Sequence, residues 1–200
     1  MVSTASLGAR NDWVRTGGGL DEVNLGRGRD YADGGDGEDF LTVNWSTSNT
    51  DVTKPSYYLY DDGAGNRLEY WSFERYKITT GSGSDYLEGG GLEDILSSGN
   101  GEDTLAGGAG GDRLTGGRGP DLFVYGGGMD EITDFAAGAG VGDRLRTAGW
   151  GAVDTWTEVQ AALVSDGGGG SILMIEDDVN EVHFIGVGVG AFAENDFLFV

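Results

Sequence analysis

Aspartate recurs at a spacing of nine residues in two parts of the chain. The first series is Asp12, Asp21, Asp30 and Asp39, and the second is Asp85, Asp94, Asp103, Asp112, Asp121 and Asp130. Glycine lies four residues before each of these aspartates. Carboxylate oxygens in glycine-rich turns suit a hard cation such as calcium, which takes about six to eight oxygen ligands in flexible geometry. The spacing therefore indicates cation binding at a series of repeated turns.

The aspartates belong to a nonapeptide repeat with the pattern G-G-x-G-x-D-x-U-x, where U is apolar. Four copies run from 7 to 42, and six run from 80 to 133. The apolar eighth residues are Val14, Val23, Ala32, Leu41, Leu87, Leu96, Leu105, Leu114, Phe123 and Ile132. This pattern resembles the calcium-binding repeat of the RTX (repeats-in-toxin) family, which forms parallel β-helices. Solvated loop aspartates on a metal-free solenoid are the alternative, but stacked carboxylates without a cation would repel one another.

The resemblance implies an all-β fold, a right-handed parallel β-roll. The first six residues of each repeat must turn sharply, which glycine permits because it tolerates positive φ. The last three form a short strand whose eighth residue points inward. Two nonapeptides make one coil, so turns two repeats apart stack about 4.8 Å from each other. The elements thus place aspartates and carbonyls of two turns around one cation.

In the RTX family, one turn contributes the carbonyls of positions one and three with its aspartate, and the other contributes those of positions two and four with its aspartate. The metal ligands that the resemblance implies are Asp21, Asp30, Asp39, Gly34, Gly35, Asp36, Gly37, Gly81, Gly83, Asp85, Gly89, Gly91, Asp94, Ser98, Gly99, Asn100, Gly101, Asp103, Gly107, Gly108, Ala109, Gly110, Asp112, Gly116, Gly117, Arg118, Gly119, Asp121, Gly126, Gly128 and Asp130.

The number of stacked turns predicts the number of calcium ions. Consecutive repeats give two sites in the first block and four in the second, about six Ca²⁺ in all, with four to eight as the range. Eight would follow if the two blocks formed one continuous stack, which the sequence leaves open. Arg10 at the fourth position of repeat 7–15 favours a cap there, and Leu92 at the same position of repeat 89–97 predicts a weaker site.

Residues 43–79 break the period and are rich in aromatic residues. Tyr57–Tyr60, the turn signal DDGAGN and Leu68–Ile78 predict a β-hairpin insert that leads into the second block. The rings either cover a joint of the roll or form a platform for carbohydrate that includes Trp71. The sequence favours the covering role, because solenoids need cover where their repeats break.

Residues 134–200 leave the nonapeptide period and predict a capping region. TWTEVQAALV predicts a short helix with Thr155 as its N-cap, and SILMIE, EVHFIG and DFLFV predict strands. The region resembles the segment that follows the roll in serralysin-type proteases and other type I-secreted proteins. The matching stretches are Asp121–Tyr125, Ile132–Phe135 and Asp196–Val200. The resemblance implies a signal for the type I secretion machinery and a secreted, extracellular or cell-surface location.

Composition excludes several classes of function. Asp and Glu number 34 against 12 Lys and Arg, so the formal charge is −22, and cysteine is absent. This charge argues against nucleic acid as a partner, and no apolar run is long enough to span a membrane. The start of the chain has no basic and apolar regions of the kind that a secretory signal peptide needs. Disulfides and thiolate metal sites are excluded.

The sequence offers no catalytic constellation, and we expect no enzyme in this chain. His183 is the only histidine, and the HExxH and G-x-S-x-G motifs are missing. We therefore predict a calcium-binding module that is disordered without calcium and folds after export. One alternative is the C-terminal region of a larger secreted metalloprotease, lipase or alginate epimerase. Another is a calcium-dependent adhesin or module that binds extracellular polysaccharide.

Overall fold

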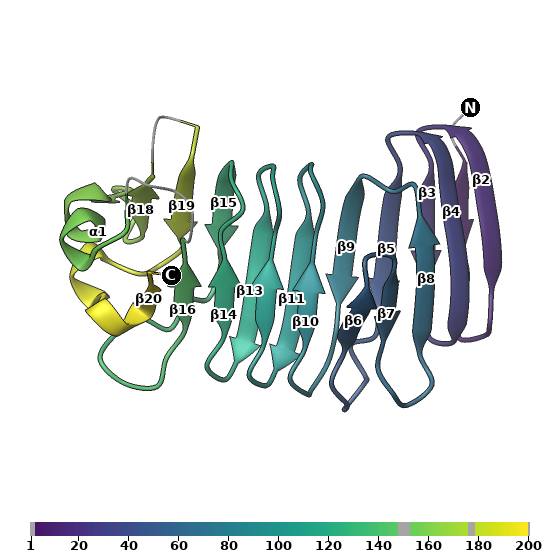
Figure 1. The fold of residues 1–200 in the computed structure, drawn as a ribbon, viewed down its shortest axis with the longest axis horizontal. Helices are drawn as coiled ribbons and strands as arrows, with labels where there is room; N and C mark the ends of the chain where they lie inside the picture. The colour runs from purple at the N-terminus through teal and green to yellow at the C-terminus, as the bar shows by residue number, and fades with distance from the viewer. Residues whose placement is uncertain (1–2, 148–152, 176–178, 200) are drawn as a thin grey trace.

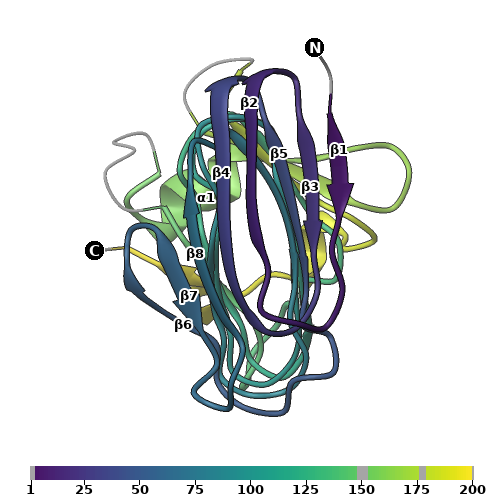
Figure 2. The same ribbon diagram turned by 90° about the vertical axis from the view of Figure 1, so that its right-hand side faces the viewer.

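The computed structural model describes residues 3–147, 153–175 and 179–199. Within these ranges the chain winds into a flattened roll whose strands form two facing layers (Figure 1). The view along the roll shows the coils stacked behind one another, with the N-terminal coil in front (Figure 2). This architecture is the parallel β-roll that the nonapeptides predict. No helix among the described residues has the length and apolar character needed to cross a membrane.

One layer is a ten-stranded sheet, called here the long sheet. Its order is β1-β3-β5-β9-β11-β13-β15-β19-β18-β17, with parallel pairing from β1 to β19 and antiparallel pairing beyond. The strands are β1 (Thr4–Ser6), β3 (Glu22–Leu25), β5 (Phe40–Asn44), β9 (Arg75–Thr79), β11 (Ile95–Asn100), β13 (Arg113–Arg118), β15 (Met129–Ile132), β19 (Glu181–Phe184), β18 (Ser171–Met174) and β17 (Leu163–Ser165).

The facing layer consists of two five-stranded sheets. The first short sheet contains β2 (Trp13–Gly19), β4 (Arg29–Gly37), β8 (Arg67–Trp71), β7 (Leu59–Asp61) and β6 (Thr53–Ser56), in that order. The second short sheet contains β10 (Tyr86–Glu88), β12 (Thr104–Ala106), β14 (Leu122–Val124), β16 (Arg144–Arg146) and β20 (Phe197–Leu198). The roll therefore has a break in one layer only.

The core between the layers is built from the eighth residues of the repeats. Leu96 pairs with Leu114 in the long sheet, and Leu105 pairs with Phe123 in the second short sheet. All ten eighth residues are buried except Val14, which is half-buried on β2, the end strand of the first short sheet. The inward direction predicted for this position is confirmed.

The insert forms the predicted hairpin, but the hairpin is shorter than the sequence suggested. β6, β7 and β8 pair antiparallel, and β8 also pairs in parallel with β4. β9 does not belong to the hairpin, because it pairs in parallel with β5 and β11. The long sheet thus runs through both repeat blocks. The chain reverses between β8 and β9 at Ser72, whose φ is 57°.

The aromatic residues of the insert are buried, half-buried or exposed, and Trp71 and Tyr76 are half-buried. Tyr60, Tyr70 and Phe73 are buried, and the rings of Tyr60 and Tyr70 stack 5.9 Å apart. Tyr57 and Tyr58 at the hairpin turn are exposed. The buried rings fill the joint between the blocks, and the exposed rings remain on the surface.

The last part of the chain covers the C-terminal end of the roll. Helix α1 (Trp156–Ala162) begins after Thr155, whose hydroxyl accepts the N–H of Glu158 as predicted. The predicted strands appear as β18, β19 and β20, and the 3₁₀ helices η1 (Val189–Ala191) and η2 (Glu194–Asp196) lie between the last two. Residues 148–152 and 176–178 of the predicted capping region, and residue 200 at the end of DFLFV, lie outside the described residues.

Candidate calcium-binding turns

The nonapeptide turns lie along the two edges of the roll. On the first edge, where the chain enters the long sheet, they are 16–21, 34–39, 89–94, 107–112 and 125–130. On the second edge, where it enters the short sheets, they are 7–12, 25–30, 80–85, 98–103 and 116–121. Within each block, turns two repeats apart stack because the strands that follow them pair in register.

A ladder of hydrogen bonds joins the aspartates of stacked turns. The Oδ1 atom of the later aspartate accepts the backbone N–H of the earlier one at 2.8–3.1 Å. These six pairs are Asp12–Asp30, Asp21–Asp39, Asp85–Asp103, Asp94–Asp112, Asp103–Asp121 and Asp112–Asp130. In each pair the accepting residue is at most 4% exposed. The protein thus fixes one oxygen of each carboxylate.

The other carboxylate oxygen, Oδ2, is buried and accepts no hydrogen bond in most of these aspartates. The residues concerned are Asp12, Asp21, Asp30, Asp39, Asp85, Asp103, Asp112 and Asp121. An ionised carboxylate buried in this way costs several kcal/mol unless a cation or donor compensates it. The unpartnered oxygens therefore fit a set of cation sites.

In Asp39, Asp112 and Asp121 the unpartnered oxygen faces the start of the residue's own turn. A Cβ atom built on Gly107 would lie 2.1 Å from Asp112 Oδ2, and one on Gly116 would lie 2.3 Å from Asp121 Oδ2. Asp94 differs, because its Oδ2 accepts the N–H of Gly90 at 2.6 Å. The repeat of Asp94 is also the one that carries Leu92 in place of glycine.

Burial raises the pKa of the Asp30, Asp94, Asp112, Asp121 and Asp130 carboxyl groups above the ordinary value. The neighbouring carboxylates raise it further, and the N–H donors of the ladder oppose the rise. The pKa is about 6 for Asp30 and Asp94, about 7 for Asp112 and Asp121, and about 8 for Asp130. Without a cation, the fold thus favours the neutral carboxyl group, and a divalent cation at Oδ2 would favour the ionised form.

Glycine is required where backbone segments of neighbouring turns approach closely. Gly117 has a φ of +102°, and a Cβ atom on it would lie 1.7 Å from the carbonyl oxygen of Gly99 in the preceding stacked turn. The same close approach recurs between Gly101 and Gly83 and between Gly35 and Gly17. Stacked carbonyls therefore follow the edges of the roll beside the aspartates.

The predicted ligand residues fall into two kinds of environment. All the aspartates at the sixth position are buried except Asp12, which is half-buried. In contrast, the side chains of Asp36, Ala109 and Arg118 at the third position are exposed, so only their backbone carbonyls can face a site. Within the described ranges, no three Asp, Glu, His or Cys side chains gather as a metal-binding group. Backbone carbonyls must therefore supply much of any coordination shell.

At the joint between the blocks, the nonapeptide turns stack on parts of the insert instead of another repeat, as where Asp94 Oδ1 accepts the N–H of Tyr76 at 2.6 Å. The Oδ1 of Asp85 accepts the N–H of Val52 at 2.7 Å, and the N–H of Asp39 donates to Glu74 at 2.8 Å. The turns 34–39 and 89–94 are separated by the reversal between β8 and β9, so they do not stack directly. Although the long sheet is continuous, the two additional pairs of stacked turns that would give eight sites are not formed.

The nine-residue spacing does not predict Asp143, which forms a further hydrogen bond of the same kind. Asp143 is 3% exposed, and its Oδ1 accepts the N–H of Asp121 at 2.9 Å. It lies 22 residues after Asp121, so the nine-residue period does not include it. A local signal exists in the sequence, because Leu145 follows two residues later and pairs with Phe123 as an eighth residue would.

The match to a protein-family profile agrees with the repeat geometry. The profile of the RTX calcium-binding nonapeptide repeat matches in four copies, at residues 7–41, 77–96, 88–123 and 97–132. No curated protein sequence matches the chain. Among solved structures, the extracellular lipase LipA from Serratia marcescens matches with a TM-score of 0.39 and 17% identity. That match covers 100% of this chain and 38% of the lipase chain, so this chain spans well under half of the lipase's length. The two nonapeptide blocks belong to the family of RTX calcium-binding repeats.

Proposed function

We propose that this chain is a calcium-binding module of a secreted protein and that calcium drives its folding. The observation that carries the proposal is the ladder of buried aspartates, in which one carboxylate oxygen accepts a backbone N–H and, in most of the aspartates, the other has no donor. Calcium is the hard divalent cation that suits carboxylate and carbonyl ligands in flexible geometry.

Each site lies between two stacked nonapeptide turns. The ligands are one carboxylate oxygen from each aspartate together with carbonyls of positions one and three from one turn and of positions two and four from the other. This set supplies about six oxygens, within the range that calcium accepts. The six directly stacked pairs of nonapeptide turns give about six ions.

The charge of the chain explains why folding depends on calcium. At a net charge of −22, the unfolded chain separates carboxylates that the roll must bring together and bury. Six calcium ions would change this charge to −10. Calcium binds the folded state and not the dispersed turns, so its binding free energy becomes folding free energy.

The proposed place of action is outside the cell. A module that needs calcium would remain unfolded at low cytosolic calcium, pass a type I secretion system, and fold where calcium is abundant. The C-terminal region is proposed to cap the roll and to carry the export signal. The chain itself is proposed to be non-enzymatic, and it can serve as the C-terminal region of a larger secreted enzyme.

Calorimetric counting of bound calcium tests the ligand assignment. Among the six stacked nonapeptide pairs, Asp112 belongs to two and Asp121 to a third, so Asp112→Ala with Asp121→Ala should remove about three of six sites. Glu102→Ala is the matched control, because Glu102 precedes Asp103 in the same block but is exposed. An unchanged count in the double variant would contradict the assignment, as would an equal loss in the control.

A further inference from the structure

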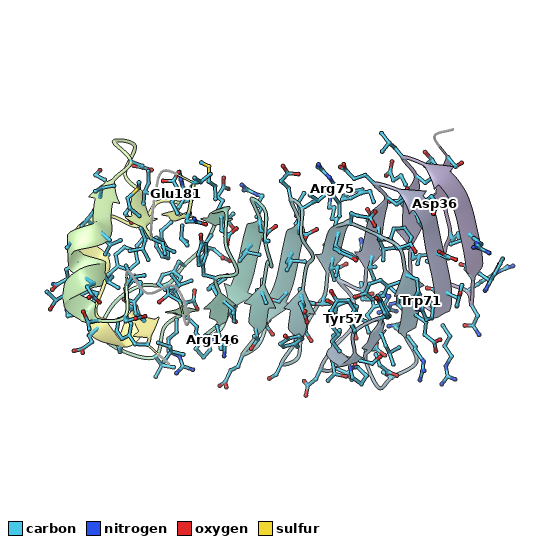
Figure 3. The ribbon with its side chains drawn as sticks, turned by 45° about the horizontal axis from the view of Figure 1, so that its top comes forward. Asp36, Tyr57, Trp71, Arg75, Arg146 and Glu181 are labelled. Atoms are coloured by element: carbon cyan, nitrogen blue, oxygen red, sulfur yellow. The ribbon has the colours of Figure 1, made fainter. Side chains whose placement is uncertain are left out.

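A groove of about 830 Å³ lies beside the hairpin. Tyr57 and Tyr58 of the hairpin turn form one wall, and Tyr86 and Glu88 of β10 contribute to the other. Arg146 of β16 also lines it, across the outer face of the second short sheet. Figure 3 shows Tyr57 and Arg146 on the same side of the roll. The volume is within the range of ligand sites, about 300–1,000 Å³.

The groove gathers aromatic rings that the fold leaves uncovered. Tyr57 is 69% exposed, Tyr58 is 44% exposed and Tyr86 is 39% exposed. The rings of Tyr57 and Tyr58 meet edge to face with centroids 4.8 Å apart. Exposed aromatic rings that converge on one groove mark a binding surface, because a core or joint would have buried them. Each ring also carries a hydroxyl group for hydrogen bonding.

A buried lysine holds two walls of the groove together. The side chain of Lys54 is 5% exposed, and its Nζ lies 3.1 Å from Glu88 Oε2. The same ammonium group lies 4.9 Å from the ring centroid of Tyr57. Burial of an ammonium group is unfavourable unless it is paired, so these contacts fix the carboxylate and the ring relative to each other. The groove is therefore preorganised although Tyr57 is exposed.

The lining fits a ligand that has apolar faces and many hydroxyl groups. Tyrosine rings can stack on the apolar faces of pyranose rings, while Glu74, Glu88 and Arg146 offer acceptors and donors for hydroxyl groups. A polyanion is disfavoured, because two carboxylates line the groove and the chain carries a charge of −22. We propose that this groove binds an uncharged oligosaccharide.

The floor of the groove connects this site to the calcium turns. Gly89, Gly90, Gly108 and Gly126 line it, and all four belong to nonapeptide turns on the first edge. The groove is complete only when these turns are stacked against the hairpin. The calcium dependence of glycan binding thus rests on the proposed function, whereas the glycan site itself rests on the groove.

Glycan binding by the full chain in calcium tests the proposal. An array of uncharged and acidic oligosaccharides identifies a ligand, and calorimetry with that oligosaccharide compares variants. Tyr57→Ala and Tyr86→Ala should each weaken binding about tenfold or more. Trp13→Ala is the matched control, because Trp13 is as exposed as Tyr57, at 69%, but lies on β2 outside the groove.

The outcomes separate the two proposals. Binding of an uncharged oligosaccharide that the groove variants lose and the Trp13→Ala variant retains supports the site. No binding, binding of acidic glycans alone, or an equal loss in Trp13→Ala overturns it, provided that circular dichroism shows each variant folded in calcium. If the chain folds and binds glycan in chelator, the proposal that calcium drives folding is refuted, whereas the proposal of a glycan site is not.

Discussion

Replacing Asp112 by asparagine separates the two tasks of the carboxylate. Its Oδ1 accepts the N–H of Asp94 at 2.9 Å, and its Oδ2 has no donor. Asparagine retains an acceptor for the ladder but places an amide nitrogen where a cation ligand is expected. Alanine removes both groups. We therefore expect Asp112→Asn to weaken calcium binding while it stabilises the calcium-free roll.

The size of the stabilisation follows from the raised pKa. Burial raises the pKa of Asp112 to about 7 from 3.8, a difference of about three pH units. At 1.36 kcal/mol per unit, the ionised carboxylate opposes folding of the calcium-free chain by about 4 kcal/mol near pH 8. Asparagine removes this charge. Alanine also removes it, but leaves the N–H of Asp94 without its acceptor, which costs about 1–3 kcal/mol.

Osmolyte-induced folding in chelator measures this difference. Trimethylamine N-oxide favours compact states, so each variant has a midpoint concentration at which β-structure appears by circular dichroism. The expected order of midpoints, from the lowest, is Asp112→Asn, Asp112→Ala and the unmodified chain. Calorimetry should show fewer bound calcium ions in both variants. An Asp112→Asn chain that is harder to fold in chelator, or that binds the full number of ions, would refute this reasoning.

Other perturbations test other parts of the structure. Gly117→Ala should weaken calcium-induced folding strongly, because the added Cβ would lie 1.7 Å from the carbonyl oxygen of Gly99. Gly91→Ala is the control, because a Cβ added there would have no atom within 4 Å. In a calcium titration followed by circular dichroism, the control should change the midpoint little. Burial raises the pKa of Asp130 to about 8 from 3.8, so the calcium-free fold holds a proton that the unfolded chain releases. Its free energy of unfolding should therefore fall as pH rises from about 4 to about 8, and more β-structure should be present in chelator at about pH 5 than at about pH 8. Leu105→Ala should destabilise the calcium-loaded roll by about 2–5 kcal/mol in urea unfolding, because Leu105 is fully buried in the core; a loss below about 1 kcal/mol would contradict tight packing there.

The repeat made much of this fold predictable from the sequence. Each nonapeptide forms a turn and a strand whose eighth residue points inward. The same unit recurs along the stack at a constant register. The burial of Leu96 and Leu114 and the alignment of Asp94 with Asp112 follow from that rule. These features depend on residues close in sequence and on one fixed offset, both of which are visible in the sequence.

Features outside the period required the structure. β9 has no glycine turn or aspartate to identify it as a roll strand, and it joins the long sheet because Ile78 pairs with Leu96. Asp143 was missed because a longer loop delays it to 22 residues after Asp121. The groove combines Tyr57 at the tip of the hairpin with Tyr86 at the start of the second block. Their proximity depends on how the hairpin packs beside β10, and the spacing of residues in the sequence does not predict that packing.

A calcium titration of the full chain, followed by far-ultraviolet circular dichroism and calorimetry, tests the central claim most directly. We predict little β-structure in chelator near pH 8, a cooperative gain of β-structure in calcium, and about six bound ions per chain. Magnesium should not replace calcium, because it requires a stricter octahedral geometry. Equal β-structure in chelator and in calcium would contradict the claim that calcium folds this chain.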